Sequence, residues 1–524
     1  MAPRGSIQRH ILVLLAVLPA DALRAAGGRL LAPQQHLACG AGTRRLAAAP
    51  AIVLAGAREA SSVERSLPVR IDGQWYELGG WAAAHPGGAW LLNYQRGRDV
   101  SALFHSVHLR SASRAEAILR KLPTIEPSAV VGAAPFVFER DAARRGEAPL
   151  ISGDGASVPV LRRSAFARDL QRLVDEEFPT AESAKADAVH WARIWLSLAL
   201  AAWCWSGWFA GSAPAIALLP LCSWLLASQT CHEATHSTLS TRPWVNFALQ
   251  FTAHPLLFNV FCWIPEHLTS HHQYTNDDAY DVDLHLFAPV RISEQTAPAA
   301  DAAPFLGTTG FSQFLVKGAL STLGTSLLQP MRALCGLRTP NFGGNITPVP
   351  APDVSRTMLA ASMAPAAFTL LWPFAALALG RVSAPVALFQ LAWPWIGASI
   401  IWTTMTQVSH IQAECQPDQP AVAPRGSDAA CWWVRQAETS LDYSAGSPLV
   451  TALSAGLNSQ SLHHALPMIC SCHFPRIYSR FAQICATHGV RLRSVPDLPT
   501  AVGGLGAFVR RLNLPSLAAD ELRR

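Results

Sequence analysis

Histidines at short, regular spacings are the residues of this chain best suited to chemistry. Histidines four residues apart on a helix lie on one face and can present their imidazoles together. Three clusters occur in the order His232 and His236; His267, His271 and His272; His463 and His464. Neutral imidazole suits iron, zinc or copper, whereas calcium and magnesium prefer carboxylates. An isolated histidine is more often a core residue, but three clusters among 18 histidines favour a transition-metal site.

The composition indicates a membrane protein. Half of the 524 residues are apolar and only 15% are charged, which is low for a soluble protein. The 11 cysteines are scattered, so neither a disulfide framework nor a zinc ribbon is indicated. Cys470 and Cys472 beside His473 form a candidate metal group, although a structural role is favoured. The net charge of +6 is not clustered, which argues against nucleic acid as a partner.

Long apolar segments must position the clusters. Four are predicted to span the bilayer, each near the roughly 20 residues that a crossing needs: about 194–211, 213–229, 358–380 and 382–405. Two hairpins return the chain to its starting side, so all the histidine clusters face one compartment. Lys185 and Arg193 beside the first span make that side cytosolic.

Two further apolar segments are not predicted to cross. If residues 247–264 spanned the membrane, the first two clusters would lie on opposite sides, so an interfacial or re-entrant segment is expected. Residues 311–334 are interpreted as lying flat on the membrane. The alternative for them is a surface loop with one packed helix.

The N-terminal third contains a second candidate site. His85-Pro86-Gly87-Gly88 follows a short alternating segment that predicts a strand with a turn at Asp72-Gly73. His108 lies farther on, four residues after Phe104. A His-Pro-Gly-Gly segment alone marks only a turn, but the combination resembles a cytochrome b5 haem pocket. That resemblance implies His85 and His108 as axial haem ligands, with His105 as the competitor for the second position.

The order H-x3-H, H-x3-H-H, Q-x2-H-H around two pairs of apolar spans resembles the membrane fatty acid desaturase family. Gln460, which opens the third box, is similar to the front-end branch of that family, whose members carry a fused cytochrome b5 domain. Three positions depart from the usual pattern without removing a ligand, namely Glu233, Leu462 and Ala465.

The resemblance implies two iron ions that activate dioxygen. The implied ligands are His232, His236, His267, His271, His272, His410, His463 and His464. Gln460 is expected to take part in catalysis by orienting a water or a neighbouring ligand, because an amide is a poor iron ligand. Asp281 and Asp283 are candidate hydrogen-bond acceptors for imidazole N–H groups, or else belong to a solvated acidic loop. Haem b would receive electrons from NADH through a separate cytochrome b5 reductase.

The expected fold is mostly α. A four-span transmembrane helical desaturase domain with a cytosolic histidine-box cap follows a small α+β cytochrome b5-like haem domain. The predicted boundaries are a targeting or disordered leader (1–62), the haem domain (63–125), a linker with an amphipathic helix (126–190), the desaturase domain (191–490) and a C-terminal tail (491–524).

The function expected from this resemblance is that of a front-end desaturase. It would act on an unsaturated acyl chain carried by a lipid or by coenzyme A, in the endoplasmic reticulum membrane or in a plastid membrane. Within the same superfamily, a sphingolipid long-chain-base desaturase or a lipid hydroxylase remains open. A histidine-rich metal transporter or membrane electron carrier is disfavoured, because the clusters lie outside the apolar segments.

Overall fold

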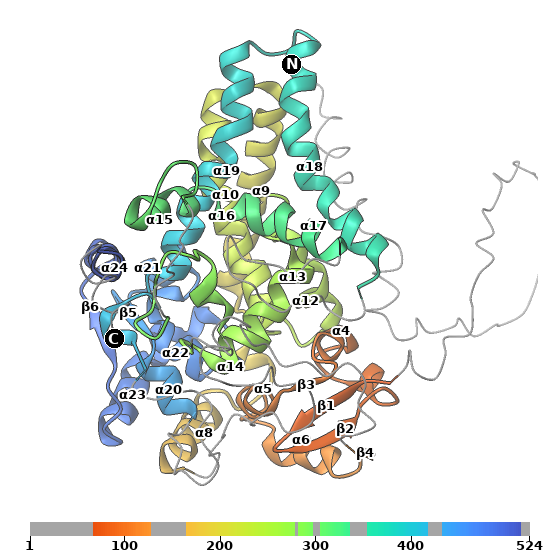
Figure 1. The fold of residues 1–524 in the computed structure, drawn as a ribbon. Helices are drawn as coiled ribbons and strands as arrows, with labels where there is room; N and C mark the ends of the chain where they lie inside the picture. Colours follow the sequence, from red (N-terminus) through yellow and green to blue (C-terminus); the bar gives the residue numbers. More distant parts are fainter. Residues whose placement is uncertain are drawn as a thin grey trace, which may run out of the picture.

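The computed structural model describes residues 66–126, 164–277, 281–296, 304–335, 354–417 and 432–514. The predicted leader 1–62 lies outside the described residues, as do 127–163 of the predicted linker and 515–524 of the tail. The described chain is mostly helical. Long helices stand on a broader cap, and a small sheet lies at the edge of that cap (Figure 1).

A four-stranded sheet with the order β3-β1-β2-β4 forms near the N-terminal end. Its strands are β1 (Pro68–Ile71), β2 (Gln74–Glu77), β3 (Arg98–Asp99) and β4 (Thr124–Ile125). Asp72 and Gly73 close the β1–β2 hairpin with φ angles of 50° and 84°, as a type I′ turn requires. The sheet is accompanied by η1 (Ala82–Ala84), α4 (Ala89–Asn93), α5 (Ser101–Val107) and α6 (Ala112–Leu119).

Four long helices form the stalk in Figure 1: α9 (Ala188–Ala210), α10 (Ala213–Ala227), α18 (Arg356–Ala378) and α19 (Ala384–Gln407). α10 continues through a π-helical turn, η4 (Ser228–His232), into α11 (Glu233–Thr235). Within the described ranges, three helices are long and apolar enough to cross a membrane: Ala213–Thr235, Arg356–Ala378 and Ala384–Gln407. Membrane association follows from these three.

α9 is the exception among the four predicted spans. Its 23 residues are enough for a crossing, but it is not among the candidate spans. It contains several tryptophans, whose indole N–H groups are polar, and Arg193 near its start. α9 nevertheless packs along α10, where Cys204 Sγ lies 3.5 Å from Cys222 Sγ. The fourth crossing therefore stays a prediction.

The two segments not expected to cross are broken into short helices. Residues 243–265 form α12 (Pro243–Leu249), η5 (Gln250–Ala253) and α13 (Val260–Pro265), and none of them belongs to a candidate span. Residues 310–334 form α15 (Gly310–Gly318), α16 (Ser321–Leu323), η8 (Gly324–Leu328) and α17 (Gln329–Leu334). This second series runs across the base of the stalk (Figure 1).

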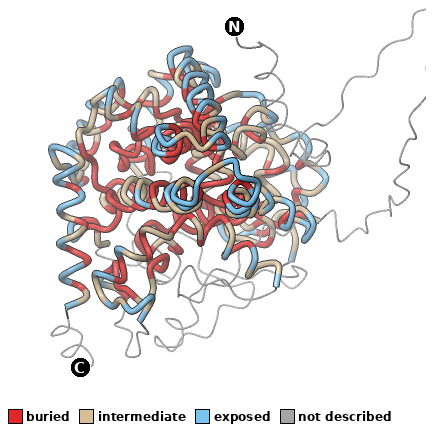
Figure 2. The backbone as a smooth tube through the Cα atoms, turned by 90° about the horizontal axis from the view of Figure 1, so that it is seen from above, coloured by how far each residue is buried: buried red, intermediate tan, exposed pale blue. Residues whose placement is uncertain are grey.

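Short elements build the rest of the cap, which encloses a buried interior (Figure 2). Before the second hairpin they are α8 (Ala165–Glu177), η3 (Glu182–Ala184), η6 (Glu266–His271), α14 (His272–Tyr274) and η7 (Val282–His285). After it come η9 (Ala413–Cys415), α20 (Trp432–Glu438), β5 (Leu441–Tyr443), α21 (Pro448–Ser454), η10 (Leu457–Ser459), α22 (Gln460–Ala465), η11 (Ser471–His473), α23 (Phe474–Thr487), β6 (Arg493–Val495) and α24 (Leu498–Leu512). β5 and β6 pair in parallel.

Gly397 marks the close approach of α19 to α10. A Cβ added there would lie 2.7 Å from Pro220 Cγ, so we expect Gly397→Ala to lower the free energy of unfolding by about 1–3 kcal/mol. Gly503→Ala in α24 is the matched control, because its new methyl meets open space and should be neutral or stabilising by up to about 1 kcal/mol. Thermal unfolding in detergent measures both. Equal midpoints for the two variants would contradict the prediction.

Candidate metal centre and haem pocket

All eight histidines named as metal ligands lie in one buried region of the cap. One group consists of His232, His236, His267 and His463, and a second of His271, His410 and His464. Within each group the candidate ligand nitrogens lie within 4.8 Å of one another. His272 lies between the groups, with Nε2 3.2 Å from His267 Nε2 and its ring stacked 4.4 Å from that of His464.

π-helical turns carry the first two histidine boxes. His232 ends η4, and both His267 and His271 lie within η6. The α-helical spacing predicts one shared face for His267 and His271, and their rings do stack with centroids 5.9 Å apart. They nevertheless join different groups, and His272, five residues after His267, contacts that ring instead. The wider turn of a π-helix, which bonds i to i+5, accounts for the difference.

Carboxylates orient His271. Its Nδ1 lies 3.2 Å from both oxygens of Asp281 and 3.5 Å from Asp283 Oδ2. Burial would lower the pKa of His271, but the two carboxylates outweigh it and raise that pKa to about 9. Asp281 Oδ2 also accepts a hydrogen bond from Asn276 N at 2.8 Å. The acidic pair thus lies where imidazole N–H acceptors are expected.

The other imidazoles are held in the neutral form. Burial first, and then the neighbouring imidazoles, lower the pKa of each of His267, His272, His410, His463 and His464. A neutral ring keeps one nitrogen lone pair for a metal ion. These five rings are therefore in the form that suits a transition metal.

Three polar residues that fix this region carry no spacing signal in the sequence. Gln436 Oε1 lies 2.9 Å from both His464 Nδ1 and Thr275 Oγ1, so it orients the His464 ring. Asn276 donates to three main-chain carbonyls around His410 and α20. Asp442 accepts from the Ser461 amide at 2.9 Å and from Tyr478 Oη at 2.7 Å, which anchors the third box.

Gln460 begins α22 and lies beside the second group. Its Nε2 is 3.0 Å from His410 Nε2, and its Oε1 is buried without a hydrogen-bond partner. An amide is a weaker metal ligand than imidazole. The second group therefore has a polar neighbour in place of a fourth strong ligand.

His85 and His108 face each other at the small sheet, in a cavity of about 520 Å³. Their ring centroids lie 6.2 Å apart with an interplanar angle of 73°. His85 Nδ1 is 3.3 Å from Gly88 O, and His108 Nδ1 is 2.8 Å from Phe104 O. Each ring thus has Nε2 left for a ligand. His105 is engaged elsewhere, since its Nε2 lies 2.9 Å from Asp72 Oδ2.

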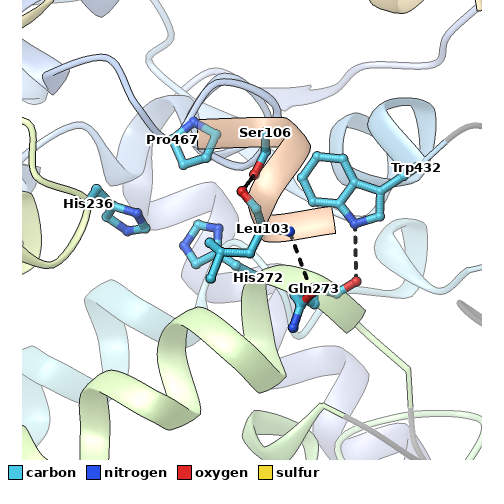
Figure 3. A pocket seen from close by; sticks show the side chains of 7 residues that line it. All are labelled: Leu103, Ser106, His236, His272, Gln273, Trp432 and Pro467. Carbon is cyan, nitrogen blue, oxygen red and sulfur yellow. Dashed lines mark hydrogen bonds between the residues drawn. The ribbon is translucent and has the colours of Figure 1, made fainter. Parts of the chain in front are cut away.

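The cavity reaches the histidine region. Its walls include Thr235, His236 and Leu268 in addition to His85 and His108. In Figure 3, Leu103 and Ser106 of α5 lie over His236 and His272 of the first two boxes. The sheet unit is therefore packed directly against the candidate metal centre.

Hydrogen bonds join the sheet unit to the second histidine box. Gln273 Nε2 donates to Asp99 O at 3.0 Å, and Gln273 Oε1 accepts from Leu103 N at 3.5 Å. Thr269 Oγ1 donates to Gln95 Oε1 at 2.7 Å. These partners alternate along the chain with the imidazoles of η6 and α14. A displacement of the sheet unit would therefore also displace the second histidine box.

Comparison with known proteins agrees with this geometry. A family model described as fatty acid desaturase matches residues 206–496. The chain is 27% identical to an acyl-lipid omega-13 desaturase of Chlamydomonas reinhardtii over 80% of this chain and 88% of that protein. It is also 27% identical to the chloroplastic acyl-lipid (7-3)-desaturase of that organism (83% and 78% covered). An acyl-lipid (8-3)-desaturase of Mortierella alpina is 26% identical (82% and 90% covered).

Gln436 offers a test of the metal centre that spares the imidazoles. Replacing it with leucine removes the acceptor that orients His464, so we expect Gln436→Leu to weaken metal retention by about 10–100-fold. Elemental analysis of the purified protein measures transition metal per chain. The control is Gln483→Leu at an exposed position of α23. Equal metal content in both variants would mean that Gln436 does not support a bound ion.

Proposed function

The chain belongs to the fatty acid desaturase family, and we propose that it is a front-end acyl desaturase with a di-iron centre and a fused haem donor. Members of this family are oxygen-dependent oxidoreductases that act on acyl lipids, and that much holds for this chain. The position and length of the acyl substrate, the metal and the donor are the proposed part. The observation that carries it is the convergence of eight imidazoles from distant segments, seven of them in two adjoining groups with His272 between the groups.

The residues present fit a pair of iron ions. His232 has two buried ring nitrogens without hydrogen-bond partners, and His463 and His464 each have an unpartnered Nε2. Such nitrogens are costly to bury unless a ligand uses their lone pairs. A bound iron pair supplies the activation of dioxygen that no side chain can provide.

The surrounding residues would set the orientation of the ligands. Asp281 lies on His271 Nδ1 and Gln436 on His464 Nδ1, so Nε2 is the nitrogen of each ring that would bind a metal ion. We propose that Gln460 orients a water there, because its unpartnered Oε1 is an acceptor beside His410. Glu233 holds the first box by accepting from Thr238 Oγ1 and, at 3.2 Å, from Ser471 N.

The sheet unit fits a b-type haem. His85 and His108 provide two opposed imidazoles with free Nε2 atoms, and Trp81 lies edge-on to His85 at 5.5 Å. A side chain at Gly87 would meet His85, since its Cβ would lie 2.9 Å from Cε1 of that ring. Haem supplies single-electron transfer when bound. Packing of α5 over His236 and His272 supports short-range electron delivery from this unit to the metal centre (Figure 3).

The membrane setting supports a lipid substrate. The three candidate spans place the histidine region at one end of the stalk. Lys185 and Arg193 lie at that end, which favours a cytosolic face and the endoplasmic reticulum. The chloroplastic relative keeps a plastid membrane as the alternative. A cytochrome b5 reductase is the proposed source of electrons from NADH.

Product analysis tests the activity. Yeast expressing the chain and fed a panel of polyunsaturated fatty acids should contain acyl chains lighter by two hydrogens, located by mass spectrometry. His272→Ala should reduce this product by more than about 100-fold. The control is His488→Ala, because His488 pairs with Asp169 at 2.8 Å away from the clusters. Added oxygen would indicate a hydroxylase, and products confined to sphingoid bases a long-chain-base desaturase; either outcome would replace the proposal.

Absorbance spectroscopy tests the haem assignment separately. His85→Ala and His108→Ala should each abolish the spectrum of six-coordinate haem in the purified chain, because each removes one opposed imidazole. His105→Ala is the matched control and should retain that spectrum, since its ring is held by Asp72. Loss of the spectrum in His105→Ala with retention in His108→Ala would reassign the second ligand.

A further inference from the structure

A second group of metal-binding residue types lies outside the histidine centre. The loop between α22 and α23 carries Cys470, Cys472 and His473, and it packs against the start of α9. Candidate ligand atoms of Asp187, Cys472 and His473 lie within 4.8 Å of one another. Those of Cys470, Cys472 and His190 do so as well. The two sets share only Cys472, so Cys470 and His190 lie outside the set that holds Asp187 and His473.

Cys472 is the cysteine that belongs to the set with Asp187 and His473. It is a free, half-buried thiol, whereas the neighbouring Cys470 is free and fully buried. The thiolate is the form of cysteine that binds metal.

His473 is oriented as metal-bound imidazoles usually are. Its Nε2 donates to Lys185 O at 2.8 Å, and the ring also has a side-chain hydrogen bond with Cys472, so Nδ1 is the nitrogen available to that sulfur or to an ion. Donation of the second ring N–H to a carbonyl fixes the tautomer of most metal-ligating histidines. Phe178 packs edge-on against the same ring at 5.2 Å and restricts its rotation.

His190, which belongs to the second set, is a poorer candidate ligand than Asp187. Both of its ring nitrogens have partners, since Nε2 lies 3.1 Å from Gln229 O and Nδ1 lies 3.0 Å from Arg193 Nη2. Asp187 Oδ1 accepts from His190 N at 2.7 Å, and its other oxygen remains available. Asp187 is exposed, so an ion can enter from solvent.

We propose that Asp187, Cys472 and His473 bind a zinc-type divalent cation that is separate from the histidine centre. One thiolate, one imidazole and one carboxylate supply three ligands to Zn²⁺. A water reaching the exposed Asp187 from solvent would complete the four-coordinate geometry that Zn²⁺ prefers.

The ion would act as a structural tie. Cys470 N donates to Ala184 O at 2.9 Å, and Ser471 N donates to Glu233 Oε1 at 3.2 Å. Glu233 lies next to His232 of the first box. Binding would thus fix the exit of the third box to the entry of α9 and to the first box. The site is independent of whether iron and haem are the cofactors.

Elemental analysis of the full chain, purified in detergent from cells supplied with zinc and iron, tests the site. We expect one zinc per wild-type chain and loss of that zinc in Cys472→Ser and in the double variant Cys470→Ser/Cys472→Ser. Cys335→Ser, at an exposed cysteine, is the matched control and should keep it. His463→Ala should lose iron and retain zinc, which separates this site from the histidine centre.

Two measurements on the wild type cover the case in which the variants fail to fold. Cobalt substitution should produce thiolate-to-cobalt charge-transfer absorption, and zinc should slow alkylation of Cys472 by iodoacetamide in peptide mass analysis. Wild-type protein that takes up no zinc and alkylates equally fast with or without it would overturn the proposal. So would a Cys470–Cys472 disulfide, or zinc retained in a folded Cys472→Ser variant.

Discussion

Burying eight imidazole rings side by side is the constraint on which the cap depends. Each ring nitrogen that has lost water and found no partner costs free energy, and several such nitrogens face one another here. The cost is tolerable only if ligands use the lone pairs and if the rings cannot rotate away. Polar residues outside the rings meet the second requirement. Gln436, Asn276 and Asp442 hold the His464 ring, the end of the second box and the third box respectively.

The arrangement of the long helices follows from the same constraint. The first histidine box lies at the end of the first helical hairpin, the second box follows that hairpin, and the third box comes after the second hairpin. All three boxes must meet on the same side of the membrane. The 243–265 segment would prevent this if it were one spanning helix, and it is instead broken into short helices. The argument from sequence against a single spanning helix agrees with this, while the interfacial or re-entrant position of the segment stays a prediction. The predicted crossing by α9 stays a prediction as well, because α9 is not among the candidate spans.

The sequence predicted that these histidines lie close together, but not that they form two groups. Spacing of four placed His267 and His271 on one face, yet a π-helical turn sends them to different groups. Gln436 could not be found in advance, because it acts from a separate helix with no spacing that links it to His464. Contacts between the sheet unit and the second box were equally unpredictable, since they depend on how two folded surfaces meet. Local motifs thus indicate candidate ligands, whereas the residues that orient those side chains appear only in three dimensions.

The position of Gln273 has a consequence for protein engineering. This residue directly follows His272, and its amide grips the backbone of the sheet unit at both Asp99 and Leu103. A sheet unit transplanted from another protein would have to offer the same carbonyl and N–H at the same separation, or it would displace the turn that carries His272. Chimaeras designed only by linker length would then misalign the second histidine box.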